Sequence, residues 1–382
     1  MTVAKHRVCD GALQVGRKCP SVFQQVAAVL QAILQSWDIF DRMTVRMADV
    51  AAHAGVSEAT VSRVLNAKPG VAAETRQAVL EAMDRLGYER PPRLRSRSAG
   101  LVGLIVPELE NPIFPAFAQV IETILAQHSY TPVLCTQTPG GVPEDEYVEM
   151  LLERSVAGIV FVSGLHADTQ ANHDRYRSLR ERGLPIVLIN GYVPGLDAPF
   201  ISHDDVQSVE LAVSHLASLG HERIGLAVGP ERFVPAQRLI EGFRRSMRVQ
   251  FGVDDPPVAA SFYTVEGGGA SATQLLDAGC TGIVCGSDLM ALGAIRAVRG
   301  RGLRVPQEVS VVGHDDSPLI AFTDPPLTTV RQAVLAMGKA AVQSLIAEIS
   351  GTRVPRTEFL FAPELVVRGS TAVAAGVRSV AG

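Results

Sequence analysis

The order of apolar and polar positions predicts two short helices joined by a tight turn over residues 47–66, MADVAAHAGVSEATVSRVLN. Gly55 lies at the turn, because glycine adopts a positive φ without penalty, and Ser57 can cap the second helix. The spacing predicts an apolar side on the first helix, formed by Ala48, Val50, Ala51 and Ala52. The same spacing places three residues of the turn and the second helix in the core, namely Val56, Val61 and Leu65.

The other side of the second helix carries small, polar and cationic residues, which suit the major groove of DNA. These outer residues are Glu58, Ala59, Thr60, Ser62, Arg63 and Asn66. The pattern alone also fits an ordinary helical hairpin. A third helix from about Ala73 to Leu86, ended by Gly87, completes a helical domain over 44–88.

From residue 101 onward, short apolar strands alternate with stretches of helical spacing, which predicts parallel sheets built from βαβ units. Two such sheets form two lobes with a cleft at the carboxyl ends of the strands. The expected strands are 101–106, 131–135, 158–162, 185–189, 223–228, 282–285 and 309–312. The expected helices include 117–128, 208–219 and 290–299. The glycine run 267–269 is interpreted as a loop.

Three segments lie outside this framework. Residues 1–43 form an N-terminal extension, expected to be disordered, which is either a real tail with one short helix or the product of an over-long start assignment. Residues 89–99 form a Pro- and Arg-rich linker in which Pro91 and Pro92 prevent helix continuation. Its arginines favour phosphate contact over a merely solvated linker. Residues 372–382 form a tail.

Charge is distributed unevenly along the chain. Residues 44–98 carry nine Lys/Arg and six Asp/Glu, a net of +3, so the rest carries −7 of the total of −4. A basic module on an acidic body fits a regulator whose body binds something other than DNA. The five scattered cysteines contain no metal-type CxxC pair, so we expect no metal site and a reducing, cytoplasmic compartment. We expect neither a membrane span nor a signal peptide.

The helical segment and its continuation, KPGVAAETRQAVLEAMDRLGY, resemble the headpiece of the lactose-repressor (LacI/GalR) family of bacterial regulators. The resemblance covers about residues 44–371. It extends, in order, through LVGLIVPELENPIF, SLGHERIGLAVGP, SDLMALGAIRAV, VPQEVSVVGHDD, DPPLTTVRQ and LVVRGST. It implies an α/β fold in which a helix-turn-helix headpiece precedes a two-lobed, periplasmic-binding-protein-like core over 100–371, with three crossings between the lobes. We expect the first lobe to comprise about 100–203 and 327–351, and the second about 204–326 and 352–371.

The resemblance also implies roles on DNA. Glu58, Ala59 and Arg63 match positions that face base edges, and Arg63 can bond a guanine in bidentate fashion. Positions that contact phosphate are matched by Arg46, Ser57, Thr60, Ser62 and Asn66. In the linker, the family's hinge helix is not clearly present. Arg93 and Arg95 are expected to contact DNA, whereas Leu94 is either the minor-groove wedge or a residue that packs on the body.

In the body, Asp288 in SDLMALGA matches an effector-binding Asp of the family, although it could also be an N-cap. Arg238 resembles a ligand-gripping Arg, but its motif is one residue longer here, which would rotate the side chain by about 100°. Asn190 replaces a family Asp and suits a neutral sugar. Further cleft residues are expected at strand ends, namely Asn111, Phe114 and Ser163. Asp315 and Asp316 are interpreted as structural.

These features predict a transcription factor, most simply a repressor, that acts as a homodimer or higher oligomer on double-stranded operator DNA. A sugar in the cleft controls its operator affinity. The segments 90–122 and 161–169 resemble actinobacterial regulators of malto-oligosaccharide and amylase genes, which implies a maltodextrin-like effector. The alternatives are a sugar-binding receptor without a DNA-binding role and an enzyme. We find no phosphate loop, nucleophile elbow or metal set, so we expect no enzyme, no cofactor and a cytoplasmic, nucleoid-associated protein.

Overall fold

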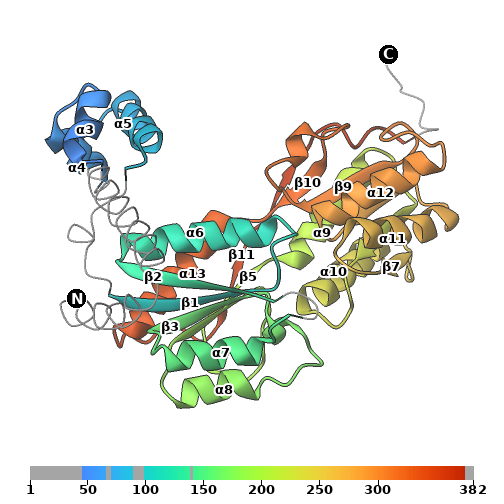
Figure 1. Cartoon of the computed structure of the whole chain (residues 1–382). Helices are drawn as coiled ribbons and strands as arrows, with labels where there is room; N and C mark the ends of the chain where they lie inside the picture. Colours follow the sequence, from blue (N-terminus) through green and yellow to red (C-terminus); the bar gives the residue numbers. More distant parts are fainter. Residues whose placement is uncertain (1–44, 66–69, 89–98, 138–140, 375–382) are drawn as a thin grey trace, which may run out of the picture. The chain divides into compact units, whose positions relative to one another are not determined.

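The computed structural model describes residues 45–65, 70–88, 99–137 and 141–374. They belong to two compact units, a helical headpiece and a larger α/β core (Figure 1). The predicted N-terminal extension, linker residues 89–98 and the chain beyond 374 lie outside the described residues.

The headpiece contains the three helices that the sequence predicts: α3 (Met47–His53), α4 (Glu58–Leu65) and α5 (Ala73–Leu86). Their core is small and aliphatic, with Val50, Ala51, Val61, Val64 and Val79 buried. Ala48 and Ala52, expected on the apolar side, are exposed. The reason is helical geometry: these two residues are four apart and share one side, whereas Val50, Ala51 and Ala54 pack on the other.

The turns of the headpiece follow the predicted chemistry. Gly55 has a φ of 65°, and Gly87, which ends α5, has a φ of 63°. Ser57 caps α4, because its Oγ accepts a hydrogen bond from the Thr60 amide at 3.2 Å. The two short helices are therefore held in their relative orientation by a glycine turn and a side-chain cap.

The first sheet of the core has the strand order β11-β5-β4-β3-β1-β2, and all neighbouring strands in it are parallel. Its strands are β1 (Gly100–Val106), β2 (Tyr130–Thr136), β3 (Gly158–Val162), β4 (Ile186–Ile189), β5 (Phe200–His203) and β11 (Glu358–Phe361). Alternate residues bury opposite faces: Leu104 and Val160 face one apolar cluster, whereas Ile105 and Phe161 face the other. Two pairs of helices cover these faces, α6 (Ile113–Gln127) with α13 (Val334–Ile349), and α7 (Glu144–Glu153) with α8 (Asp174–Glu181).

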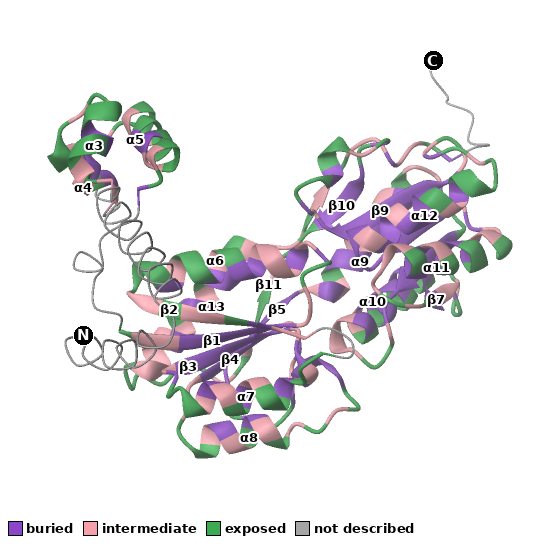
Figure 2. Cartoon of the chain, in the orientation of Figure 1, coloured by how far each residue is buried: buried purple, intermediate pink, exposed green. Residues whose placement is uncertain are grey.

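The second sheet has the order β12-β10-β9-β8-β6-β7, and only the β10–β12 pair is antiparallel. Its strands are β6 (Ile224–Val228), β7 (Val258–Ala260), β8 (Gly282–Cys285), β9 (Ser310–Asp315), β10 (Thr328–Arg331) and β12 (Glu364–Val366). Its helices are α9 (Asp205–Ser218), α10 (Val234–Phe251), α11 (Val265–Asp277) and α12 (Asp288–Gly300). Both sheets have a buried interior and exposed outer helix surfaces (Figure 2). The predicted α/β architecture with two lobes is confirmed.

The chain crosses between the lobes three times, as the resemblance implies, but the predicted lobe boundaries near the C-terminus are wrong. β10, assigned to the first lobe, pairs with β9 of the second sheet. β11, assigned to the second lobe, pairs with β5 of the first. Because a strand four residues long joins whichever sheet edge its backbone can pair with, its own sequence does not determine its lobe.

The interpretation of Gly267–Gly269 as a loop is also wrong, because the run lies inside α11. A Cβ on Gly268 would lie 2.1 Å from the Met290 carbonyl oxygen of α12, and one on Gly293 would lie 1.9 Å from the Val265 carbonyl oxygen. Glycine is therefore required on both helices, because their backbones pack in direct contact.

The predicted tail begins later than expected. The Ala372 amide donates to Ser310 Oγ at 3.0 Å and the Ala374 amide donates to the Leu219 carbonyl at 2.9 Å. Residues 372–374 are thus anchored on the second lobe.

Candidate functional site

The outer side of α4 is the candidate DNA-reading surface. Glu58, Ala59 and Arg63 are exposed, whereas Val61 and Val64 are buried against the other helices. Thr60 and Ser62 are half-buried at the margin of this surface. The side of α4 that the sequence assigns to base edges is therefore exposed to solvent.

The start of α4 supplies groups suited to a phosphate. Exposed amides at a helix N-terminus attract anions, and the Ser57 and Thr60 hydroxyls lie 3.0 Å apart there. Arg46, exposed ahead of α3, is fixed by its backbone amide, which donates to the Asp49 carboxylate at 2.7 Å. The remaining predicted DNA contacts, Asn66, Arg93, Leu94 and Arg95, lie outside the described residues.

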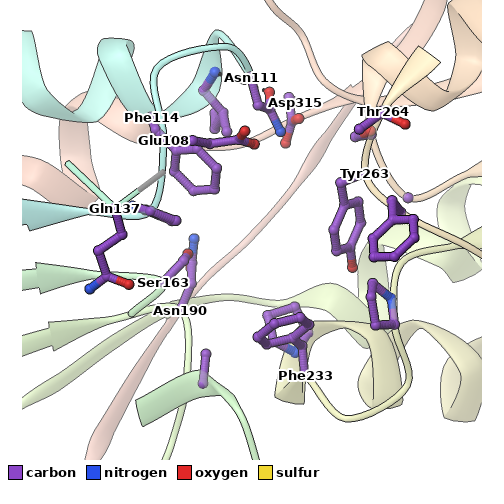
Figure 3. A pocket seen from close by; sticks show the side chains of 18 of the residues that line it. Glu108, Asn111, Phe114, Gln137, Ser163, Asn190, Phe233, Tyr263, Thr264 and Asp315 are labelled. Carbon is purple, nitrogen blue, oxygen red and sulfur yellow. Dashed lines mark hydrogen bonds between the residues drawn. The ribbon is translucent and has the colours of Figure 1, made fainter. Parts of the chain in front are cut away.

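A cavity of about 650 Å³ lies between the two lobes of the core. Four of the six predicted effector residues line it: Asn111, Phe114, Ser163 and Asn190 (Figure 3). All four come from the first lobe, where they follow or lie close to the carboxyl ends of β1, β3 and β4. The second lobe contributes the opposite wall, largely through residues that were not predicted from the sequence.

The backbone is strained where polar residues enter this cleft. Ser163 follows β3 with a φ of 45°, Asn190 follows β4 with a φ of 59°, and Asp315 ends β9 with a φ of 113°. Non-glycine residues with positive φ are uncommon, and they cluster at binding and active sites. Here the strain turns three polar side chains toward one cavity.

Two asparagines of the first lobe are fixed by hydrogen bonds to backbone amides. Asn111 Oδ1 accepts from the Ile113 amide at 3.4 Å, and Asn190 Oδ1 accepts from the His203 amide at 3.2 Å. In both side chains the bonded atom is the oxygen, so the amide NH₂ is the group that each can offer to a ligand.

Arg238 does not line the cleft, so the structure does not bring it together with the other predicted effector residues. Its two terminal nitrogens donate to the two carboxylate oxygens of Glu358, both at 2.8 Å. The next residue, Leu239, lines the cavity instead. The extra residue in the motif rotates the arginine by about 100° around α10 and away from the ligand space.

Asp288 is buried and is not among the residues that line the cavity, so the structure does not bring it together with the other predicted effector residues. Its carboxylate accepts from the Ser317 amide at 2.7 Å and from the Thr329 hydroxyl at 2.6 Å. Burial raises its pKa to about 6, while the bond from the Ser317 amide opposes that rise. Asp288 therefore ties together β10 and the segment after β9, and its neighbour Ser287 reaches the cleft.

Asp315, interpreted as structural, lines the cleft. Its Oδ1 accepts from Gln332 Nε2 at 2.7 Å, whereas its buried Oδ2 has no hydrogen-bond partner among the described residues. Burial and the nearby Asp288 raise the pKa of Asp315. Burial also raises the pKa of Asp205, on the same wall, to about 8. Two buried carboxyl groups thus offer hydrogen bonds to a ligand.

Histidine and arginine add little positive charge to the cleft. Burial lowers the pKa of His314, which lines the cavity, to about 4. Arg232 Nε donates to the Asp168 carboxylate of the other lobe at 2.8 Å. Glu108, whose pKa is raised by burial and by Glu110, also lines the cavity. The charge balance disfavours an anionic ligand.

Aromatic rings supply the apolar surface of the cleft. Phe114 lies on the first lobe, and Phe233, Phe262 and Tyr263 lie on the second. Figure 3 shows Tyr263 and Phe233 on the wall opposite Phe114 and Asn111. A few oriented polar groups among aromatic faces are typical of sites for small ligands. No signal in the local sequence marks Phe233, Phe262 and Tyr263, because they belong to loops without a recognised motif.

The two lobes also contact each other directly beside the cleft. The Thr169 amide donates to the Arg232 carbonyl at 2.8 Å, and Asp168 forms an antiparallel bridge with Phe233. Among the described residues, no cluster of three or more His, Cys, Asp and Glu side chains could hold a metal ion. Within the same ranges, no helix has the length and apolar character needed to cross a bilayer.

Comparisons with known proteins agree with this architecture. Residues 46–91 match the model of the bacterial regulatory proteins of the lacI family, and residues 213–371 match a periplasmic binding protein-like domain. The chain is 65% identical to the HTH-type transcriptional regulator MalR of Streptomyces coelicolor, over 88% of this chain and 99% of that protein. It is 31% identical to the repressor CytR of Escherichia coli K12, over 85% of this chain and 96% of CytR.

Solved structures show the same relationship. A complex of the transcriptional regulator CelR with cellobiose superposes with a TM-score of 0.64 at 29% identity, covering 85% of this chain and 99% of that one. The lac repressor dimer bound to operator gives a TM-score of 0.63 at 29% identity, covering 86% and 99%. These matches cover the headpiece as well as the core, which decides against a receptor or an enzyme. The chain belongs to the LacI family of bacterial transcriptional regulators.

Proposed function

We propose that this regulator is a repressor whose homodimer binds a two-fold symmetric operator and whose operator affinity is controlled by a maltodextrin-like sugar. The observation that carries the DNA half of the proposal is the exposure of Glu58, Ala59 and Arg63 on α4, opposite its buried side. Arg63 is the only cation among these three residues, and a bidentate bond to guanine contributes about 1–3 kcal/mol of discrimination. Arg46, Ser57, Thr60 and Ser62 are assigned to phosphate, and Asn66, Arg93, Leu94 and Arg95 stay predictions.

The cleft supports a neutral, hydroxyl-rich effector. Its amides and buried carboxyl groups can exchange hydrogen bonds with hydroxyls, and its aromatic rings can lie against the apolar face of a sugar. Asp205 and Asp315, whose pKa values are raised by burial, offer no positive charge to a phosphorylated sugar. CelR was solved with cellobiose, and two other LacI-family regulators were solved with ribose. The resemblance to malto-oligosaccharide regulators directs the choice toward maltodextrin.

The experiment compares wild-type protein with Arg63→Ala on an operator selected from random duplex DNA. Arg63→Ala should weaken operator binding at least 10-fold, because one bidentate base contact is lost, while maltotriose binding by calorimetry stays unchanged. Glu74→Ala, an exposed charge removal on α5, is the matched control. A normal footprint by Arg63→Ala would show that the DNA-reading surface is assigned wrongly.

A thermal-shift screen tests the effector. A ligand that binds only the folded state raises its stability by RT ln(1 + [L]/Kd). Maltotriose and longer malto-oligosaccharides should raise the melting temperature, and glucose 6-phosphate should not. A shift with phosphorylated sugars alone would contradict the charge argument.

A further inference from the structure

Gln137, which follows β2, lines the first-lobe side of the cleft and was not recognised in the sequence. Its Nε2 donates to Glu144 Oε2 at 2.8 Å. Glu144 begins α7 and is only 1% exposed, so this bond joins a cleft residue to a buried carboxylate.

Glu144 is surrounded by donors. The Tyr176 hydroxyl donates to its Oε1 at 2.5 Å, and the Leu165 amide donates to its Oε2 at 3.1 Å. A terminal nitrogen of Arg175 lies 3.7 Å from Oε1. The Tyr176 oxygen in turn accepts from the His166 amide at 2.8 Å, so the phenol is fixed as the donor toward Glu144.

The direction of these bonds determines the orientation of Gln137. An ionised carboxylate has acceptors only, whereas the glutamine amide has one donor end and one acceptor end. Glu144 therefore selects the NH₂ end of Gln137 and leaves Oε1 for the cleft. Figure 3 shows the Gln137 amide with its oxygen on the cavity side and its nitrogen on the far side.

We propose that Gln137 is a specificity residue that accepts a hydrogen bond from a ligand hydroxyl, and that Glu144 is the positioning residue that keeps this acceptor facing the cleft. This inference rests on the proposed function, since it takes the ligand to be a sugar. It predicts that one hydroxyl of the ligand must act as a donor. Replacement of that hydroxyl by fluorine, which cannot donate, removes the interaction.

Glu144 has a second connection to the cleft, which the test must separate from the first. Through the Leu165 amide it holds the loop that contains Ser163 and Ala167, both of which line the cavity. Loss of that support would lower the affinity for all ligands by a similar factor. Loss of the Gln137 orientation would change only the preference for a hydroxyl over fluorine at one position.

The experiment measures the affinity of full-length protein for maltotriose and for its monodeoxyfluoro analogues by calorimetry. Wild-type protein should bind one analogue about 10-fold more weakly than maltotriose because of Gln137. Gln137→Met should lower the affinity for maltotriose by a similar factor. This variant should then bind maltotriose and that analogue with equal affinity. Glu144→Gln, whose neutral amide no longer selects one end of Gln137, should shrink the discrimination by at least half. Gln274→Met, an exposed change on α11, should behave as wild type.

Unchanged maltotriose affinity in Gln137→Met overturns this assignment and leaves the proposed function intact. The positioning role of Glu144 is overturned if Glu144→Gln loses affinity for maltotriose and every analogue by the same factor and keeps the wild-type preference for the hydroxyl over fluorine. Failure of wild-type protein to bind maltotriose contradicts the proposed effector and this inference together. Gln137 is only partly buried, so its variant tests the proposal even where Glu144→Gln folds poorly.

Discussion

Arg238 on α10 and Glu358 on β11 form a bidentate ion pair that joins the two lobes, with both nitrogen-to-oxygen distances at 2.8 Å. The side chains are 22% and 15% exposed, so neither charge is well hydrated. The pair and the neighbouring Asp205 raise the pKa of Arg238 against the opposing effect of burial. The arginine that the sequence assigned to the ligand thus serves the junction between the lobes.

Arg238→Met should lower the free energy of unfolding by about 2–3 kcal/mol, because it leaves the Glu358 carboxylate in a poorly hydrated place without a partner. Arg238→Met combined with Glu358→Met should recover at least half of that loss, since both charges are then gone. Urea denaturation of the two single variants and the double variant measures this. Additive losses in the double variant would show that the pair is not coupled.

Asp288→Ala should destabilise the core by about 2–4 kcal/mol, because the Ser317 amide and the Thr329 hydroxyl lose a buried acceptor. Since Asp288 does not line the cleft, the folded variant should bind maltotriose within a factor of about three of wild type. Denaturation and calorimetry at a temperature well below unfolding test the two parts. Normal stability with lost sugar binding would restore Asp288 as a ligand contact.

Asp205 should make stability depend on pH. Its pKa is raised to about 8 in the folded protein and lies near 4 in the unfolded chain, so the folded state retains a proton between these values. This contribution is complete below about pH 4 and is lost as the pH rises toward 8, by about 1.4 kcal/mol per unit. Asp205→Asn lacks this dependence.

The difference in unfolding free energy between Asp205→Asn and wild type should therefore shift in favour of the variant by about 1.4 kcal/mol for each unit from pH 5 to pH 7. The opposing effect of His314, whose pKa is lowered by burial to about 4, is common to both proteins and cancels in the difference. Asp255→Asn, at an exposed position, is the control. A constant difference across this range would show that Asp205 ionises normally.

Gly268→Ala should cost about 2–3 kcal/mol of stability, because its Cβ would meet the Met290 carbonyl oxygen at 2.1 Å and force α11 away from α12. Gly300→Ala is the matched change at the end of α12, where no atom lies within 4 Å of the new Cβ. It should be neutral or stabilise by up to about 1 kcal/mol, since alanine favours helix. Thermal denaturation compares the two, and equal effects would mean that close packing does not explain the glycine.

Much of this fold follows from local sequence. The seven expected strands and the three headpiece helices form, because apolar runs and glycine turns act over a few residues. The edge strands β7 and β12, of three residues each, give no comparable signal. The lobe assignment of β10 and β11 depends on distant pairing partners, and the glycine run of α11 depends on the backbone of another helix.

The residues of the candidate site also differ in whether local sequence or distant contacts determine their positions. Asn111, Phe114, Ser163 and Asn190 could be predicted because they follow strand ends, where the fold gathers side chains. Arg238 and Asp288 matched motifs, yet their contacts depend on one residue of helical rotation and on donors from β10 and the segment after β9. Gln137 could not be recognised at all, since its orientation comes from a carboxylate buried in a different element.

The most direct measurement of the central claim is the affinity of the full-length dimer for its selected operator with and without saturating maltotriose, by fluorescence anisotropy at fixed salt. Coupling between two sites is typically worth about 1–3 kcal/mol, so we predict a 5- to 150-fold change in operator affinity. Arg63→Ala should show little operator binding in either condition. Maltotriose that binds in calorimetry but leaves operator affinity unchanged would contradict the claim that the cleft controls DNA binding.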